Sequence, residues 1–235
     1  MNEIYVSDEY WKENESMHVE DAEFKVDNAI SLLRQCEFSP TSILDCGCGS
    51  GKHAYLMARE CQVLTKGIDV SPGAVAHAQG EYALDNLSYE QISIAEVGEN
   101  EFDLGLMFDV FEHVDDYIGF LRIAKTKAEY WLFNIPLDMN VISTVLGSYI
   151  KFRRQFGHLH YFSDRSALAT LAYAGFDVVD SRYVFDAGHC IRARANFRNV
   201  IASLPRALLF RVSPSWCSRI FGGPSLMVLA RNEST

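Results

Sequence analysis

ILDCGCGSG at residues 43–51 and GIDV at residues 67–70 are the two stretches that decide the fold. The first reads as an apolar strand that passes Asp45 and turns through Gly47, Gly49 and Gly51 into a helix over residues 52–61. Because glycine has no Cβ, the backbone can turn sharply here and approach a ligand closely. The free N–H groups at the start of the following helix favour an anionic group such as a carboxylate.

Asp69 ends a second predicted strand, 24 residues after Asp45. A carboxylate at this place can accept hydrogen bonds from both hydroxyls of a ribose, which implies a cofactor that carries adenosine. A nicotinamide dinucleotide is the competing cofactor, but its fold prefers a G-x-G-x-x-G spacing that this loop lacks. Asp45 would also repel a pyrophosphate, whereas it could bind an ammonium group.

Strands and helices alternate outward from these motifs. Further strands are expected at residues 63–69, 89–94, 102–108, 130–135, 176–185 and 226–230, and further helices at 71–83, 116–126 and 163–174. This order predicts an α/β, Rossmann-like, mostly parallel sheet with helices on both faces and ligands at the carboxyl ends of its strands. We expect an N-terminal helical cap at residues 1–38 and a main domain at 39–235, with lid insertions at about 137–162 and 186–223.

The motifs resemble those of class I S-adenosylmethionine-dependent methyltransferases. ILDCGCGSG looks like the first motif of that family, and GIDVSPGAV looks like its acidic second-strand motif. FDLGLMFDVFEHVDD resembles the fourth-strand segment, and HLHYFSDRSALATLAYAGFDVVDSRY resembles the closing helix and strand. The resemblance covers about residues 40–185, and residues 224–230 fit a last strand. It implies seven strands with the last one antiparallel, and S-adenosylmethionine as cofactor.

The motif and the resemblance together assign cofactor contacts to eleven residues. These are Asp45, Cys46, Gly47, Gly49, Gly51, Asp69, Val70, Ser93, Ile94, Phe108 and Asp109. The family often places an acid near the adenine amine after the third strand, where this chain has Ser93-Ile94-Ala95. Serine can still accept a hydrogen bond, and Ile94 could pack on the adenine face.

Polar side chains after the fourth strand are the candidates for catalysis. Methyl transfer from a sulfonium needs positioning, and a hydroxyl or amine acceptor also needs a base or a metal. Asp109-Val110-Phe111-Glu112-His113 would place two acids and an imidazole on one face of a helical turn, a spacing that suits a proton relay or a divalent cation. His158 and His160 could reach the same region.

This segment is similar to the ExxEH pattern, with a later histidine, of small-RNA 2′-O-methyltransferases and ubiquinone-pathway O-methyltransferases. That resemblance implies a Mg²⁺ site, here with Asp109 in place of a glutamate. We therefore predict catalytic roles for His113, Glu112 and His160, and a metal site from Asp109, Glu112, His113 and His160. A purely structural role for the segment is the alternative.

The charge is divided unevenly along the chain. Residues 1–150 hold 9 basic and 26 acidic side chains, a net −17, and residues 151–235 hold 12 and 5, a net +7. The acidic first part argues against a general nucleic-acid binder. Residues 186–223 contain six arginines interleaved with apolar residues and no acid after Asp186. Such a lid could grip a phosphate or carboxylate or lie on an anionic membrane, and an amphipathic helical pair packed on the domain is the alternative.

The predicted function is transfer of a methyl group to a hydroxyl, or an amine, of a small acceptor that is phosphate-bearing or linked to a lipid or sugar. The arrangement also resembles bacterial small-molecule and glycan-pathway methyltransferases. The alternatives are N-methylation of a small molecule, a nicotinamide-dependent oxidoreductase and a non-catalytic cofactor-binding module. The longest apolar runs are too short to span a bilayer, and six cysteines without metal-site spacing suggest free thiols, so we expect a cytoplasmic protein. The sequence does not indicate an oligomeric state.

Overall fold

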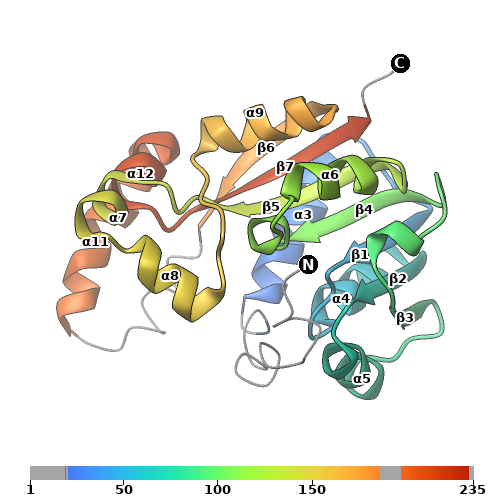
Figure 1. Ribbon diagram of the computed structural model, residues 1–235. Coiled ribbons are helices and arrows are strands. Elements are labelled where there is room, and N and C mark those ends of the chain that lie inside the picture. Colours follow the sequence, from blue (N-terminus) through green and yellow to red (C-terminus); the bar gives the residue numbers. More distant parts are fainter. Residues whose placement is uncertain (1–18, 20, 186–196, 233–235) are drawn as a thin grey trace.

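The computed structural model describes residue 19, residues 21–185 and residues 197–232, and its strands form one seven-stranded sheet in the order β3-β2-β1-β4-β5-β7-β6 (Figure 1). The strands are β1 Ser42–Cys46, β2 Leu64–Asp69, β3 Leu87–Gln91, β4 Phe102–Phe108, β5 Ala128–Pro136, β6 Phe176–Val184 and β7 Ser225–Asn232. β7 runs antiparallel to β5 and β6, and the other pairs are parallel. The predicted Rossmann-like fold with an antiparallel last strand is confirmed.

Helices cover both faces of the sheet. They are α3 Ala22–Gln35, α4 Lys52–Cys61, α5 Pro72–Glu81, α6 Tyr117–Lys125, α7 Val141–Leu146, α8 Tyr149–Phe156, α9 Asp164–Ala174, α11 Phe197–Val212 and α12 Pro214–Phe221, with 3₁₀ turns η1 Ile94–Glu96 and η2 Phe111–His113. α3 and α4 bury apolar side chains against one face, and α6 and α9 against the other. α5 packs with α4 beside the edge strand β3.

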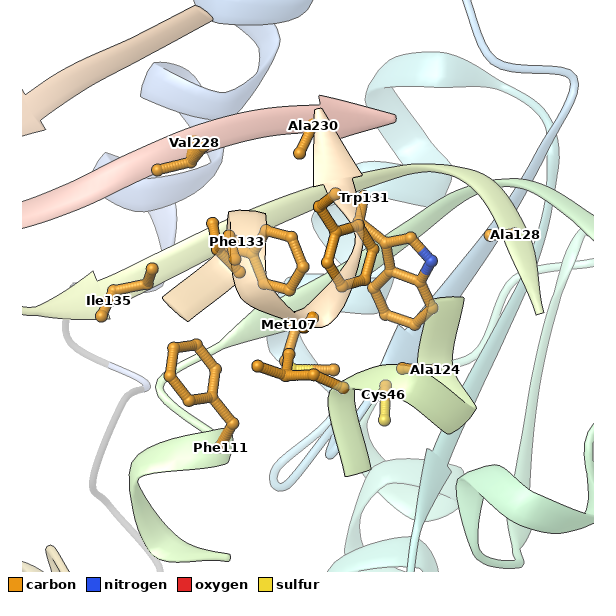
Figure 2. Close-up of a cluster of buried hydrophobic side chains, with 14 of the residues drawn as sticks. Cys46, Met107, Phe111, Ala124, Ala128, Trp131, Phe133, Ile135, Val228 and Ala230 are labelled. Atoms are coloured by element: carbon orange, nitrogen blue, oxygen red, sulfur yellow. The ribbon is translucent and has the colours of Figure 1, made fainter. Parts of the chain in front are cut away.

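Alternating side chains of the central strands build the two halves of the core. Leu104 and Leu106 of β4 point to the side of α3 and α4, whereas Met107 joins Trp131 and Phe133 on the side of α6 and α9. The rings of Trp131 and Phe133 lie side by side (Figure 2), and their centroids are 6.0 Å apart. A Cβ at Gly105 would lie 2.6 Å from the indole of Trp131, so only glycine allows this packing.

Local signals in the sequence set most helix ends. The Ser71 hydroxyl accepts a hydrogen bond from the Ala74 amide at 3.1 Å, and Pro72 occupies the first turn of α5. Ser163 caps α9 in a reciprocal pair with Ser166, and Gly175 ends that helix in the left-handed region at φ 95°. These boundaries lie within one or two residues of those expected from the sequence.

The third strand differs from the prediction. Residues 89–94 were expected to form it, but β3 ends at Gln91 and the chain then enters η1. The reason is a capping box, in which the Glu96 carboxylate accepts a hydrogen bond from the Ser93 amide at 2.8 Å. Ser93 therefore begins a turn at the edge of the sheet instead of extending the strand.

The described parts of the expected cap and lids are helical. α3 packs on the sheet through Ala22, Val26, Ala29 and Leu32. The lid insertions contain α7 and α8, and α11 and α12, which gather at one end of the molecule (Figure 1). Residues 1–18, 20 and 186–196 of these predicted segments lie outside the described residues.

Two sequence expectations outside the site can also be compared with the structure. Among the described helices, none has both the length and the apolar character that crossing a membrane requires. The five cysteines within the described ranges are all free thiols.

Candidate functional site

The glycine loop leads from β1 into α4 and is hydrogen-bonded to the carboxyl end of β2. The amides of Gly47 and Cys48 both donate to the Ile68 carbonyl, at 2.8 and 2.9 Å. The Asp69 carboxylate accepts one hydrogen bond from the Gly49 amide and one from the Ser71 amide, each at 2.9 Å. The loop and the acid that ends β2 therefore hold each other in place.

Each glycine of the loop has a positive φ, but their surroundings differ. A Cβ at Gly51 would lie 2.6 Å from the Ala78 Cβ, and one at Gly47 would lie 2.8 Å from a methyl of Val110. No atom of the residues that the structure describes lies within 4 Å of the Cβ position of Gly49. Gly47 and Gly51 allow close packing, whereas the described residues leave space at Gly49 in which a ligand can approach the backbone.

Asp45 lies beneath this loop with 2% of its surface exposed. Its Oδ2 has no hydrogen-bond partner among the described residues. Burial, with the nearby charge of Asp69, raises the pKa of the Asp45 carboxyl to about 7, although a hydrogen bond from the Ala54 backbone opposes the shift. A buried carboxylate with an unpaired oxygen is a place where a positively charged ligand group would be stabilised.

The other predicted cofactor residues occupy different environments. Cys46 is buried, and burial raises the pKa of its thiol far above its usual range. Val70 is half-buried at the end of β2, and its carbonyl accepts a hydrogen bond from the Gln91 amide group. Ile94 and Phe108 are buried in the core, with 4% and 6% of their surfaces exposed. Val70 is thus partly accessible, whereas the side chains of Ile94 and Phe108 belong to the hydrophobic core.

Asp109 follows β4 in the left-handed region, at φ 55°. Its Oδ2 accepts a hydrogen bond from the Lys25 ammonium at 2.6 Å, and its Oδ1 accepts one from the Asn134 amide at 2.8 Å. Lys25 also pairs with Asp21 at 2.8 Å. Burial alone would lower the pKa of Lys25, but the two carboxylates raise it above its ordinary value. Asp109 therefore belongs to a buried ion network that joins α3, β4 and β5.

This placement corrects one expectation. Asp109, Glu112 and His113 do not share a helical turn, because η2 begins only at Phe111 and the backbone of Asp109 is left-handed. The Asp109 carboxylate is oriented toward Lys25 and Asn134, and it is not a member of the cluster that Glu112 and His113 form.

Glu112, His113 and His158 form a compact polar cluster. One potential ligand atom of each lies within 4.8 Å of those of the other two. Glu112 is fully buried, and neither of its carboxylate oxygens has a hydrogen-bond partner among the described residues. His113 Nε2 lies 4.0 Å from Glu112 Oε1. Burial, then the charge of Asp109, raises the pKa of Glu112 well above its ordinary value, so a cation beside it would be stabilising.

His158 enters the cluster from the loop before α9. Its Nδ1 lies 2.7 Å from Asp138 Oδ2, and its ring centroid lies 4.9 Å from that of His113. A carboxylate on one ring nitrogen fixes the orientation of an imidazole. The amides of Leu159 and His160 donate to the Glu112 carbonyl at 2.9 and 3.0 Å, which fastens this loop to η2.

His160 lies outside the cluster. Its Nε2 lies 3.0 Å from the Val114 carbonyl, and its ring is 4.4 Å from that of Tyr117. The structure therefore brings His158, and not His160, to the pair of Glu112 and His113. The segment that carries Glu112 also touches the glycine loop, since Val110, two residues before Glu112, lies against Gly47.

Three polar residues of this region were missed from the sequence: Lys25, Asn134 and Asp138. Lys25 occupies a core-facing position between Ala22 and Val26, where lysine is unusual, and this could have been a signal. Asn134 likewise interrupts the apolar strand WLFNIP. Asp138 carries no such signal, because its partner His158 is 20 residues away.

Comparisons with known proteins show the family to which the chain belongs. Residues 19–181 match a family model described as a methyltransferase domain. The chain is 30% identical over 149 residues to a ubiquinone biosynthesis O-methyltransferase of Neisseria meningitidis, covering 57% of this chain and 60% of that protein. It is 34% identical over 94 residues to ajmaline N-methyltransferase of Rauvolfia serpentina, covering 37% and 32%.

The chain spans 35% to 60% of the length of the ubiquinone-pathway relatives that it matches. Among solved structures, the magnesium protoporphyrin IX methyltransferase of Synechocystis with bound S-adenosylhomocysteine has a TM-score of 0.60. It is 16% identical, and the match covers 89% of this chain and 82% of that one. This likeness shows the same fold.

Proposed function

The chain belongs to the family of methyltransferase domains, and from this premise we propose that it moves the methyl group of S-adenosylmethionine to a hydroxyl of a small anionic acceptor. Membership of the family confirms the prediction of a class I S-adenosylmethionine-dependent methyltransferase. It also removes the nicotinamide-dependent oxidoreductase from consideration. The nature of the acceptor is the open question.

The residues at the carboxyl ends of β1 and β2 fit the cofactor. The buried Oδ2 of Asp45 has no hydrogen-bond partner in the described ranges, and the methionyl ammonium would supply one. Gly49 borders open space, so the cofactor can approach the backbone there. Asp69, held by two backbone amides, is oriented to accept hydrogen bonds from the ribose hydroxyls. Ser93 and Val70, at the ends of neighbouring elements, would border the adenine.

The single observation that favours a hydroxyl acceptor is the cluster of Glu112, His113 and His158, which lies on the segment that touches the glycine loop through Val110. Both Glu112 oxygens are buried beside two imidazoles and have no hydrogen-bond partner in the described part of the chain. A hydroxyl must lose its proton as it is methylated, and an imidazole is the usual group that accepts it. In the proposed step the acceptor oxygen bonds to the methyl carbon as the carbon–sulfur bond breaks. The sulfonium becomes a thioether, and the hydroxyl proton moves to His113, whose positive charge Glu112 stabilises.

The same three side chains also fit a divalent cation, because their ligand atoms converge within 4.8 Å. Glu112, His113 and His158 would hold it, while Asp109 and His160 have other partners. Two imidazoles and one carboxylate suit Mn²⁺ or Zn²⁺ better than the Mg²⁺ implied by the sequence resemblance. A bound cation would lower the pKa of the acceptor hydroxyl directly.

The experiment is incubation of the chain with methyl-labelled S-adenosylmethionine and a metabolite extract, followed by mass spectrometry of the labelled product. We expect label on an oxygen of a small anionic molecule. Label on a nitrogen would establish the N-methyltransferase alternative, and label only in protein or RNA would contradict a small acceptor. Absence of any transfer, with cofactor still bound, would favour the non-catalytic module.

A chelator separates the two ways of activating the hydroxyl. If His113 acts as a base, turnover persists after removal of divalent cations. If a cation is held by the cluster, turnover is lost and returns on addition of Mn²⁺ or Zn²⁺. The matched control is S-adenosylhomocysteine affinity, which involves Asp45 and Asp69 and should not change with chelation.

A further inference from the structure

The helices α7, α8, α11 and α12 form a cluster at one end of the molecule, apart from the helices that cover the sheet (Figure 1). α7 packs against α12, and α12 packs against α11. α8 has no buried residue, and α7 buries only Ser143. α8 contacts its own chain through half-buried aromatic side chains, since Tyr149 lies against Tyr161 and Phe156 against His158. Its Ile150, by contrast, is exposed and available to another partner.

This cluster exposes large apolar side chains. Seven of the thirteen large hydrophobic residues that are exposed in the described part of the chain lie on these four helices. They are Val141, Val145 and Leu146 on α7, Ile150 on α8, Leu208 and Val212 on α11, and Trp216 on α12. Val145, Leu146 and Val212 are each more than 70% exposed. Apolar surface gathered in this way marks an interaction site.

The charge of the cluster is of one sign. The sequences of the four helices contain seven basic residues and no acid, in a chain whose net charge is −10. Arg206 and Arg219 have partners inside the protein, at the Phe221 carbonyl and the Asp164 carboxylate. Lys151, Arg153, Arg154 and Arg211 are exposed. These last four are placed to meet an anionic surface.

Basic and apolar side chains also share a hollow on this cluster. It has a volume of about 460 Å³ and is lined by Gly147, Ile150, Lys151, Arg154 and Gln155. Two cations beside an exposed isoleucine match the chemistry of a lipid phosphate above its acyl chains.

From these observations we infer that the α7–α8–α11–α12 cluster docks the protein on an anionic lipid bilayer. An exposed tryptophan, exposed aliphatic side chains and exposed cations without acids are the composition of a surface that lies in the headgroup region. A symmetric second copy fits less well, because a two-fold contact would place the basic clusters of both chains against each other. The inference rests on the proposed function, and it makes the acceptor a lipid-linked molecule. The reason is that α7 is the next element after the carboxyl end of β5.

The test is co-sedimentation of the full chain with vesicles of phosphatidylcholine alone and with about one third phosphatidylglycerol added. We expect binding to the anionic vesicles only, weakened by high salt. Arg153→Glu should reduce the partition coefficient about fivefold or more, and Leu146→Gln with Ile150→Gln about tenfold. Arg59→Glu and Leu64→Gln are matched controls, since Arg59 and Leu64 are similarly exposed on α4 and β2, and they should change it by less than about twofold.

Equal binding to both kinds of vesicle, no binding, or equal effects of cluster and control variants would overturn the inference. Self-association in ultracentrifugation that the cluster variants abolish, without vesicle binding, would assign this surface to a second copy. Circular dichroism and S-adenosylhomocysteine affinity show that each variant is folded. Vesicle binding needs neither cofactor nor acceptor, so a failure to bind vesicles would leave the proposed methyl transfer intact. A failure of methyl transfer would likewise leave the vesicle binding intact.

Discussion

The two halves of the site are built in opposite ways. The cofactor half is a continuous strand, loop and helix, in which Asp45 and the three glycines lie within seven residues, and Asp69 joins it from the adjacent strand. The acceptor half combines η2 with His158 from a loop more than 40 residues later, and a buried ion pair to α3 lies behind it. A local motif specifies the cofactor half, whereas the acceptor half depends on long-range contacts.

The ion network of Lys25 gives the largest expected effect on stability. Lys25→Met would leave Asp109 buried without its cation and should lower the free energy of unfolding by about 3–5 kcal/mol. Lys66→Met removes a lysine that pairs with Glu90 near the surface and should cost less than about 1 kcal/mol. Urea denaturation of both variants measures the difference. Equal effects would mean that the long-range contact does not stabilise the acceptor half.

Glu112→Gln should separate the two halves functionally. The change keeps the shape of the side chain but removes the charge that stabilises a protonated His113, so we expect turnover to fall about 100-fold. The dissociation constant of S-adenosylmethionine should stay within about threefold, because Asp45 and Asp69 are untouched. Steady-state kinetics and calorimetry check the two quantities. Unchanged turnover would remove Glu112 from the chemistry.

Alanine substitutions at two glycines test whether the loop of the cofactor half is tightly packed. Gly51 and Gly147 both have positive φ, but only at Gly51 would a Cβ meet other atoms, at 2.6 Å from Ala78. Gly147→Ala should cost about 1–2 kcal/mol from backbone strain alone. Gly51→Ala should cost about 1–3 kcal/mol more and also weaken cofactor binding. Thermal unfolding with and without S-adenosylhomocysteine tests this, and equal losses would contradict a tightly packed loop.

The two histidines of the loop before α9 provide a matched pair of variants, and the variant of His160 should have the smallest effect on turnover. His160→Asn removes a hydrogen bond to a backbone carbonyl and should change turnover by less than about threefold. His158→Asn removes a member of the cluster and should lower turnover by about tenfold or more. Kinetics of both variants under the same conditions decide which histidine serves the site. The reverse order would restore the role predicted for His160 from the sequence.

The same division explains how much the sequence could predict. Alternating apolar segments and caps such as Ser71 and Ser163 are local, so the strands, helices and glycine loop were predictable from residue patterns. The early end of β3 depends on the capping pair of Ser93 and Glu96, which a strand pattern does not reveal.

The acceptor half was predicted only in part, since Glu112 and His113 follow a strand directly. His158, and not His160, lies in the cluster because Asp138 pairs with it in the folded chain. Asp109 is oriented toward Lys25, which α3 supplies. Spacing along the sequence holds no information about such contacts.

Calorimetric titration of S-adenosylmethionine into the full chain between pH 5 and pH 8 tests the central claim most directly. The pKa of Asp45 is raised to about 7, so below that pH the free protein must release a proton before the carboxylate can pair with the ammonium. Affinity should therefore rise about tenfold per pH unit up to pH 7 and then level off. Asp45→Asn should bind weakly and without this dependence. Absence of binding, or wild-type affinity that does not change with pH, would contradict the assignment of Asp45 to the cofactor site.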